Sequence, residues 1–453
     1  MTGEVKSSDD RSVSNEGQPG RIVKSTSVVD LAAVSPAQRK FRPDVEGLRA
    51  LAILLVVLFH AGVPGVRGGF IGVDVFFVIS GFLITGLLLR EESRTGRLSL
   101  ARFYARRCRR ILPVASLMVI LTVFAAYHWL GFLEGNSVAT DAKWTSLFIA
   151  NVHFAAIGTN YFSSQAPPSP LQHMWSLSVE EQFYAVWPLL MIVVAATRRR
   201  ISLRLRLGVT LAMIIVVSFS WSVIETGQNG VWAYFSPFTR AWELAIGGLV
   251  AVASPLIIRI PRHVCWIMGF VGFGAVLVCG AVFSSRTPYP GSAVAIPVLG
   301  TVFVITAGSS LGGPGVEGIL RVRPLQWLGA RSYSLYLWHW PILVIAAEYA
   351  GKTLPVWKNL LWLLVALGIS MVSYRLIENP IRRSKWLGAR SVVSIGLGIL
   401  LIGASLVVAQ WELRSHSGAN GMRPLPNSVS APHAAMPNPI DRMGVYDGEK
   451  SSS

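Results

Sequence analysis

Charged residues are scarce in this chain, and cysteines are scarcer. Only 14% of its 453 residues are Asp, Glu, Lys or Arg, whereas 52% are hydrophobic and the mean hydropathy is +0.51. Because soluble domains usually carry about 25% charged residues, this composition excludes an ordinary soluble protein. The three cysteines, Cys108, Cys265 and Cys279, lie in one predicted inner loop and one predicted helix, so they offer no disulfide framework.

Several catalytic motifs are also missing. The sequence has no Walker A loop, no dinucleotide fingerprint beside a strand, no HExxH and no spaced Cys/His set. Mechanisms that depend on a metal or on nucleotide hydrolysis therefore lack support, and we expect an acid/base mechanism without a metal. A cleavable signal peptide is not visible either, because the first stretch of about 40 residues is polar.

What the chain does have is a series of long apolar runs. They predict an all-α, polytopic membrane helix bundle of about eleven transmembrane helices. The predicted spans are 50–63, 70–89, 111–131, 182–197, 207–223, 240–255, 264–284, 292–309, 332–348, 359–377 and 391–411. We place 144–158 as an outer-face or re-entrant element, because a crossing there would turn the following basic run outward.

The net charge of +18 is typical of some nucleic-acid-binding proteins, but its distribution indicates a membrane topology instead. The predicted inner segments hold 30 of the 41 Lys and Arg residues and the predicted outer segments hold 9. By the positive-inside rule the N-terminus is cytoplasmic and the C-terminus is outside. We therefore expect a multi-pass protein of a bacterial cytoplasmic membrane, with lipid and no nucleic acid as partner.

Composition divides the chain into four parts. Residues 1–41 are rich in Ser, Gly, Asp and Lys and predict a disordered cytoplasmic leader, and residues 412–453 are rich in Pro and Ser and predict a disordered extracytoplasmic tail. Between them lie a transmembrane domain over 42–385 and an additional transmembrane helix over 386–411.

Arg49 and His60 are the most informative residues in the chain. Their spacing of eleven is three helical turns, so both side chains point the same way, about 16 Å apart along the axis. Ionisable groups in a membrane are costly and usually functional, and a buried imidazole is suited to act as a general base. The alternative is a packing histidine that a neighbouring helix satisfies.

Carboxylates follow at two predicted outer helix ends. Asp74 comes after a short connection and is predicted to orient the His60 imidazole, or else to compensate the helix dipole. Glu180 and Glu181 point about 100° apart on a helix, so one of them should enter a shared cavity, and we favour Glu181 as a catalytic residue. Glu180, alternatively a solvated carboxylate at the helix start, and His173 are candidate substrate-binding residues.

Two further groups complete the candidate site. Arg107 and Arg110 are three residues apart on one helical face and could clamp a phosphorylated ligand, or only anchor the topology and touch anionic lipid. Arg240 and Glu243 at an outer helix mouth, and His339 near the inner end of the ninth span, are supporting substrate-binding candidates. Their alternatives are an i, i+3 ion pair and an interfacial aromatic belt.

Taken together, these residues and five sequence blocks resemble the membrane-bound acyltransferase-3 family over about residues 41–385. The blocks are GGFIGVDVFFVISGFLIT, RRCRRILP, WSLSVEEQFYAVWP, SYSLYLWHWP and YRLIENPIR. The resemblance implies transfer of an acyl group, often acetyl, from cytoplasmic acyl-CoA to a hydroxyl of a carbohydrate, glycolipid or small natural product. It places Arg49 and His60 on the essential Arg and His of the family, and Arg107 and Arg110 on its RxxR pair.

Members of that family usually have ten core helices, and larger ones add an eleventh that leads to an extracytoplasmic SGNH-hydrolase-like domain. This chain has the eleventh predicted helix and stops about forty residues later. We therefore expect either a separate SGNH-like partner or an acceptor that enters the membrane domain directly. The hypothesis is an O-acyltransferase that binds acyl-CoA phosphates at the arginines and uses His60 as the base.

The rival interpretation is a transporter or a lipid-linked glycan flippase in which His60 belongs to a proton relay. A non-catalytic membrane scaffold is weaker, because it would have no need of buried ionisable groups.

Overall fold

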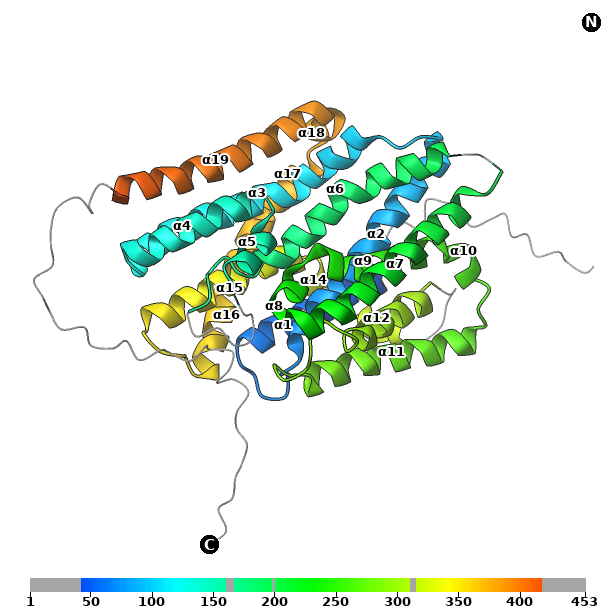
Figure 1. The fold of residues 1–453 in the computed structure, drawn as a ribbon, viewed down its shortest axis with the longest axis horizontal. Coiled ribbons are helices and arrows are strands. Elements are labelled where there is room, and N and C mark those ends of the chain that lie inside the picture. The colour runs from blue at the N-terminus through cyan, green and yellow to red at the C-terminus, as the bar shows by residue number, and fades with distance from the viewer. Residues whose placement is uncertain (1–41, 160–166, 198–199, 310–314, 418–453) are drawn as a thin grey trace, which may run out of the picture. The chain divides into compact units, whose positions relative to one another are not determined.

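The computed structural model describes residues 42–159, 167–197, 200–309 and 315–417, and these residues are helical with no strand among them (Figure 1). The first helices are α1 (Pro43–His60), the 3-10 helix η2 (Gly69–Ile71), α2 (Gly72–Thr95), α3 (Leu100–Trp129), α4 (Phe132–Ser146), α5 (Ala150–Ala156) and α6 (Met174–Ala196). They are followed by α7 (Leu203–Gln228), α8 (Gly230–Phe235), α9 (Pro237–Val252), α10 (Ser254–Ile257), α11 (Arg262–Val282), α12 (Ala295–Ala307) and α13 (Val316–Leu320). The last are α14 (Arg323–Gly329), α15 (Ser332–Tyr349), α16 (Val356–Ser373), the π-helix η3 (Tyr374–Glu378), α17 (Asn379–Arg383), α18 (Lys385–Ala389) and α19 (Ser391–Ser417).

The predicted all-α membrane bundle is confirmed. Seven helices in the described residues are long and apolar enough to cross a membrane: Gly69–Thr95, Leu100–Trp129, Met174–Ala196, Leu203–Gln228, Arg262–Val282, Val356–Ala389 and Ser391–His416. The other four predicted spans overlap with α1, α9, α12 and α15. The chain is a multi-pass membrane protein, while the number of crossings and their direction remain predictions.

Helix α1 is displaced from its predicted bounds of 50–63. It begins at Pro43, where the fixed φ of proline suits the first turn, and Asp44 and Glu46 complement the N-terminal dipole. It ends at His60, because the following turn contains Gly62 at a φ of 74°. His60 is therefore the last residue of a helix and does not lie in its middle.

The predicted leader 1–41 and most of the predicted tail lie outside the described residues, although α19 extends past residue 411 to Ser417.

Helix α2 is the central helix of the bundle. In its most apolar 18-residue window 72% of the residues are buried, compared with 22% for α7, α16 and α19. It approaches α9 closely through two glycines: a Cβ on Gly81 would lie 1.8 Å from the carbonyl oxygen of Leu244, and one on Gly247 would lie 2.0 Å from that of Val78. Small residues at helix interfaces allow this backbone contact.

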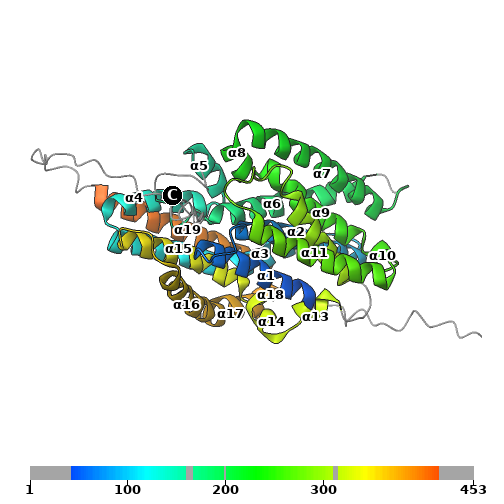
Figure 2. The same cartoon turned by 90° about the horizontal axis from the view of Figure 1, so that it is seen from below.

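The additional helix α19 runs beside α3 and α4 (Figures 1 and 2). It is fixed to α3 by Arg109, whose guanidinium donates to the carbonyl oxygen of Leu387 at 2.9 Å and to the Ser394 hydroxyl at 2.8 Å. On the other side of the bundle α11 packs on α12, and α16 packs on α15.

Residues 144–158 form no continuous helix. Helix α4 ends at Ser146, Phe148 has a φ of 55°, and α5 contains only seven residues. Seven residues rise about 10 Å, far less than the hydrocarbon thickness of about 30 Å. This segment therefore does not cross the membrane as one helix.

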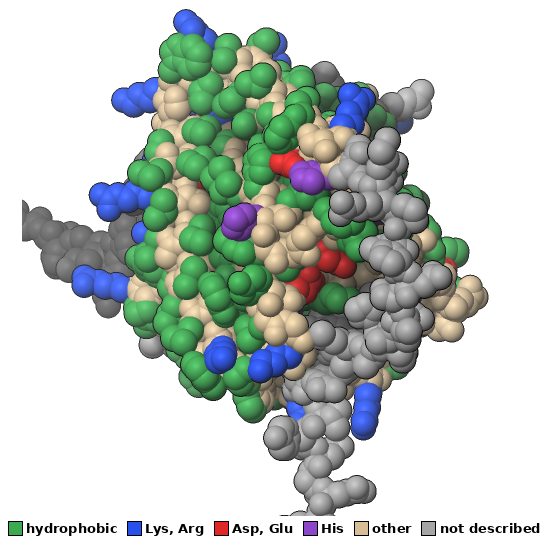
Figure 3. Space-filling view, turned by 90° about the vertical axis from the view of Figure 1, so that its left-hand side faces the viewer, with side chains coloured by type: hydrophobic (Ala, Val, Ile, Leu, Met, Phe, Trp, Pro, Cys, Tyr) green, Lys and Arg blue, Asp and Glu red, His purple; other side chains and the backbone are tan. Residues whose placement is uncertain are grey.

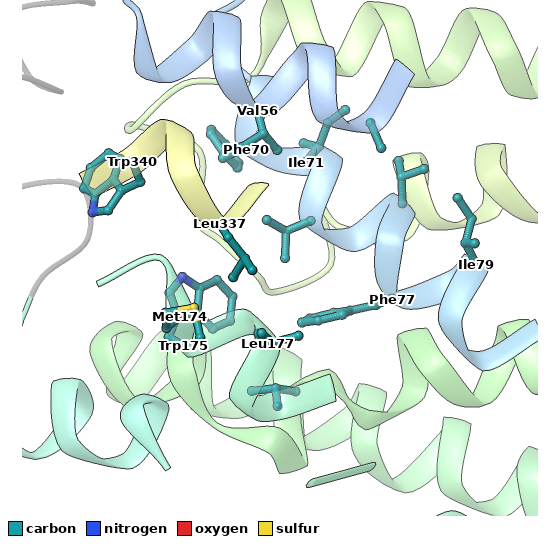
Figure 4. Close-up of a cluster of buried hydrophobic side chains, with 14 of the residues drawn as sticks. Val56, Phe70, Ile71, Phe77, Ile79, Met174, Trp175, Leu177, Leu337 and Trp340 are labelled. Atoms are coloured by element: carbon teal, nitrogen blue, oxygen red, sulfur yellow. The ribbon is translucent and has the colours of Figure 1, made fainter. Parts of the chain in front are cut away.

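A hydrophobic core joins α1, α2, α6 and α15 (Figure 4). Phe77 from α2 faces Trp175 from α6, with ring centroids 6.3 Å apart and an angle of 88° between the rings. Leu337 from α15 points into the same cluster. Figure 3 shows the end of the molecule that lies on the left of Figure 1. Hydrophobic side chains cover much of it, with His, Asp and Glu side chains among them and Lys and Arg toward its margins.

Candidate functional site

A cavity opens between α1, α2, α3, α6 and α15. Its polar lining consists of Arg49, Ser80, Arg107, Arg110, Ser176, Glu180, Tyr184, Ser332, Tyr333 and Tyr336. Its apolar lining consists of Val73, Phe76, Phe77, Ile79, Leu83, Ile84, Ile111 and Leu177. The three arginines that the sequence singles out for a phosphorylated ligand thus face one cavity.

Arg107 and Arg110 lie on the same face of α3, as their spacing predicts. The Arg107 guanidinium lies 5.0 Å from the ring centroid of Tyr184 and 5.7 Å from that of Phe103. Neither Arg107 nor Arg110 forms a salt bridge within the described part of the chain. Arg49 lies 3.3 Å from the carboxylate oxygens of Glu46.

The remaining arginines of the same stretch have partners away from the cavity. Arg102 and Arg106 pair with Glu91 at 3.2 and 2.9 Å, and Arg109 holds α19. Burying a positive charge that has no salt bridge costs free energy unless a bound anion neutralises it. The cavity wall is therefore suited to bind an anionic ligand.

Glu180, and not the favoured Glu181, lines the cavity. Its carboxylate accepts hydrogen bonds from the hydroxyls of Ser80, at 2.5 Å, and of Tyr184. Glu181 Oε1 is buried and has no hydrogen-bond partner among the described residues. Trp187 of α6 is buried, and the rotation of the helix about its axis decides which of the two adjacent carboxylates faces the cavity.

Three buried histidines, His60, His173 and His339, form a cluster next to the cavity. His60 Nδ1 lies 3.0 Å from His339 Nε2, and the two rings stack at 13° with centroids 5.2 Å apart. The His173 ring lies 5.8 Å from that of His339. All three residues are buried, with 6%, 0% and 2% exposure for His60, His339 and His173. His339 is the eighth residue of α15, so it does not occupy the predicted place at the inner end of its helix.

Tyr336 connects the cavity to these histidines. It lines the cavity, its ring lies 5.5 Å from that of His339, and its hydroxyl donates to the carbonyl oxygen of His173 at 2.8 Å. It also lies 2.6 Å from the Ser176 hydroxyl. His60 is not itself part of the cavity lining, so Tyr336 and His339 separate it from the arginines.

Asp74 belongs to a different cluster. Arg240 donates to Asp74 Oδ1 at 2.7 Å and to Glu243 Oε1 at 2.8 Å, and the Tyr289 hydroxyl donates to Asp74 Oδ2. The i, i+3 pair of Arg240 and Glu243, the alternative to their predicted role as substrate-binding residues, is present, and Asp74 joins it from α2. His339 lies at hydrogen-bonding distance from the His60 ring, a position that the sequence assigns to Asp74 or Glu181.

Sequence reasoning missed several polar residues of the site. Tyr184 is four residues after Glu180 and so shares its helical face, a signal that could have found it. Tyr336 sits in an aromatic-rich block, which resembles an interfacial belt. Tyr289 lies in an irregular segment with no local signal. Within the described ranges no group of three His, Cys, Asp or Glu side chains is arranged to hold a metal ion.

Comparison with known proteins then identifies the family. The family model described as acyltransferase domain matches residues 42–375. The chain belongs to the acyltransferase-3 family. This range contains every candidate site residue and ends ten residues before the predicted domain boundary at 385. No solved structure matches this acyltransferase-3 chain.

Three relatives show what this acyltransferase-3 chain is similar to. It is 31% identical over 409 residues to peptidoglycan O-acetyltransferase OatA of Listeria monocytogenes, covering 82% of this chain and 64% of the relative. It is 34% identical over 361 residues to putative peptidoglycan O-acetyltransferase YrhL of Bacillus subtilis, covering 76% and 55%. It is 31% identical over 361 residues to O-acetyltransferase OatA of Staphylococcus aureus, covering 76% and 58%. The matched region thus spans less than two thirds of the length of these relatives.

Proposed function

We propose that this membrane domain transfers an acetyl group from acetyl-CoA to a hydroxyl of a cell-envelope carbohydrate, with His60 as the general base. The observation that carries the proposal is one cavity wall with Arg49, Arg107 and Arg110, joined through Tyr336 to the buried pair of His60 and His339.

The donor proposal depends on charge. The phosphate groups of an acyl-CoA require several cationic donors, and guanidinium groups bind phosphate by paired, charge-assisted hydrogen bonds. Arg107 and Arg110 form no salt bridge in the described structure, and Arg49 adds a third cation to the same cavity. The apolar lining, which includes Phe76, suits the uncharged arm of the donor.

The chemical step needs a base, because a hydroxyl is a weak nucleophile at neutral pH. His60 takes the proton of the acceptor hydroxyl while its oxygen forms a bond to the thioester carbonyl carbon. The carbon–sulfur bond then breaks, and the leaving thiolate takes up the proton that His60 holds. The burial of His60 and His339 limits access of water, which would otherwise hydrolyse the thioester.

The acceptor proposal rests on the relatives, two of which are named for O-acetylation of peptidoglycan. A carbohydrate of the envelope is therefore the first acceptor to test, with a glycolipid or a small natural product as the other classes. The alternative to this direct transfer is a separate SGNH-like protein that hands the acetyl group on to the carbohydrate.

Asp74, Arg240 and Glu243 have a supporting role in this scheme. Their hydrogen bonds link α2 to α9, and α2 contributes much of the cavity wall. We propose that this cluster positions α2 and that the acceptor binds nearer to His173 and Glu180.

The deciding test is acetyl transfer by the purified protein in lipid nanodiscs. His60→Ala should lower turnover at least about 100-fold, the usual contribution of a general base, and leave acetyl-CoA binding unchanged. His128→Ala, at an exposed position of α3, is the matched control and should keep full activity. Near wild-type turnover of His60→Ala would end the assignment, and transport of an unmodified glycan would favour the rival function.

A further inference from the structure

The hydrogen bonds of His339 determine which ring nitrogen of His60 carries the proton. We infer that His339 is a positioning residue that holds His60 in the tautomer with the proton on Nδ1 and the lone pair on Nε2. The inference rests on the proposed function of His60 as the base and names the nitrogen that performs it.

The first step concerns His339 Nδ1. This nitrogen lies 2.7 Å from the carbonyl oxygen of Tyr336 and 3.2 Å from that of Leu335. Carbonyl oxygens only accept hydrogen bonds, so Nδ1 must carry a proton and donate it. In a neutral imidazole the other nitrogen, Nε2, is then an acceptor.

The second step passes this pattern to His60. His339 Nε2 lies 3.0 Å from His60 Nδ1, and two lone pairs at that distance would repel each other. His60 Nδ1 must therefore carry a proton and donate to His339. In the neutral His60 ring this leaves the lone pair on Nε2, the nitrogen that can accept a proton from a hydroxyl.

A charged His339 would reverse the pattern, but its surroundings oppose a charge. The residue is 0% exposed, its ring contacts are His60, His173 and Tyr336, and no carboxylate bonds to it in the described structure. A buried charge without a counter-ion is far more costly than a neutral ring.

The same geometry suits His60 after it has taken a proton. Its Nδ1–H still donates to His339, so the ring need not turn during the reaction. The Trp340 ring lies 4.4 Å away at 55°, and an aromatic ring attracts a neighbouring cation. The hydrogen bond between His60 and His339 therefore does not have to change when His60 takes a proton.

Two substitutions separate positioning from simple packing. His339→Leu removes the acceptor, whereas the side-chain carbonyl of His339→Gln can still accept from His60 Nδ1–H. We expect His339→Leu to lower kcat about 100-fold and to leave the KM for acetyl-CoA within about twofold. His339→Gln should recover at least about tenfold of the lost kcat. His263→Leu, at an exposed position, is the control and should behave as wild type.

Nitrogen NMR of the 15N-histidine-labelled protein tests the tautomer without any activity measurement. The His60 signal, assigned by its loss in His60→Ala, should show a protonated Nδ1, and His339→Leu should weaken that preference. A protonated Nε2 in neutral His60, or equal kcat values for His339→Leu and wild type, would overturn this inference alone. An active His60→Ala enzyme would instead overturn the proposed function.

Discussion

Five arginines within nine residues of α3 have different surroundings. Arg102 and Arg106 share Glu91, Arg109 holds α19, and Arg107 and Arg110 face the cavity without an ion pair in the described structure. All five look alike as a basic run in the sequence. Their chemical roles follow from the face of the helix on which each one lies.

Removing a charge from the cavity wall should weaken donor binding. We expect Arg107→Gln and Arg110→Gln each to raise the KM for acetyl-CoA by about 10- to 150-fold, since loss of one charge-assisted phosphate contact costs about 1.5 to 3 kcal/mol. Steady-state kinetics with varied acetyl-CoA measures this. Arg106→Gln removes the same charge from the same helix outside the cavity and should leave KM unchanged. If all three variants behave alike, the cavity arginines have no special role in binding.

At the scale of elements, the packing of α2 against α9 positions the residues of α2 that line the cavity. Gly81 and Gly247 bring the two backbones together, and the buried pair of Asp74 and Arg240 joins the same helices by hydrogen bonds. Since α2 carries Phe76, Ser80 and other lining residues, any displacement of this helix changes the shape of the cavity.

A methyl group at this contact should separate the helices. Gly81→Ala would place its Cβ 1.8 Å from the Leu244 carbonyl oxygen, so we expect a loss of about 1 to 3 kcal/mol in unfolding free energy and reduced activity. Gly86→Ala, on the same helix, meets its nearest atom at 3.4 Å, and it should be neutral or stabilising by up to about 1 kcal/mol. Denaturant unfolding in micelles compares them, and equal stability would show that the contact is not tight.

Local patterns predicted the elements and the contacts within them. Apolar runs located the helices, and a spacing of three predicted the shared face of Arg107 and Arg110. The same spacing gave the pair of Arg240 and Glu243 as the alternative to their predicted role in substrate binding. Contacts between distant helices were not predictable in this way. His60 meets His339 across 279 positions and Asp74 meets Arg240 across 166, and both depend on how whole helices pack.

The whole molecule has its basic residues mainly on one predicted side of the membrane. In that topology Arg107 and Arg110 lie at the cytoplasmic end of α3, the side on which the proposed donor acetyl-CoA is available. The loop around Ser93 is then inside, and the loop around Ser285 is outside.

Two matched cysteines test this orientation. In a chain with Cys108, Cys265 and Cys279 replaced by serine, Ser285→Cys should react with a membrane-impermeant maleimide in intact cells. Ser93→Cys should react only after the membrane is permeabilised, because both positions are exposed in the structure and only the bilayer distinguishes them. The opposite labelling pattern would place the arginine cavity outside and would contradict a cytoplasmic donor.

Helix α1 carries Arg49 near one end and His60 at the other, and a helix keeps such a separation constant at about 16 Å. On the proposed mechanism, a donor must span that interval with its nucleotide and its thioester at opposite ends. A truncated thioester could satisfy one end but never both. The helix would therefore select its donor by molecular length, independently of which acyl group the donor carries.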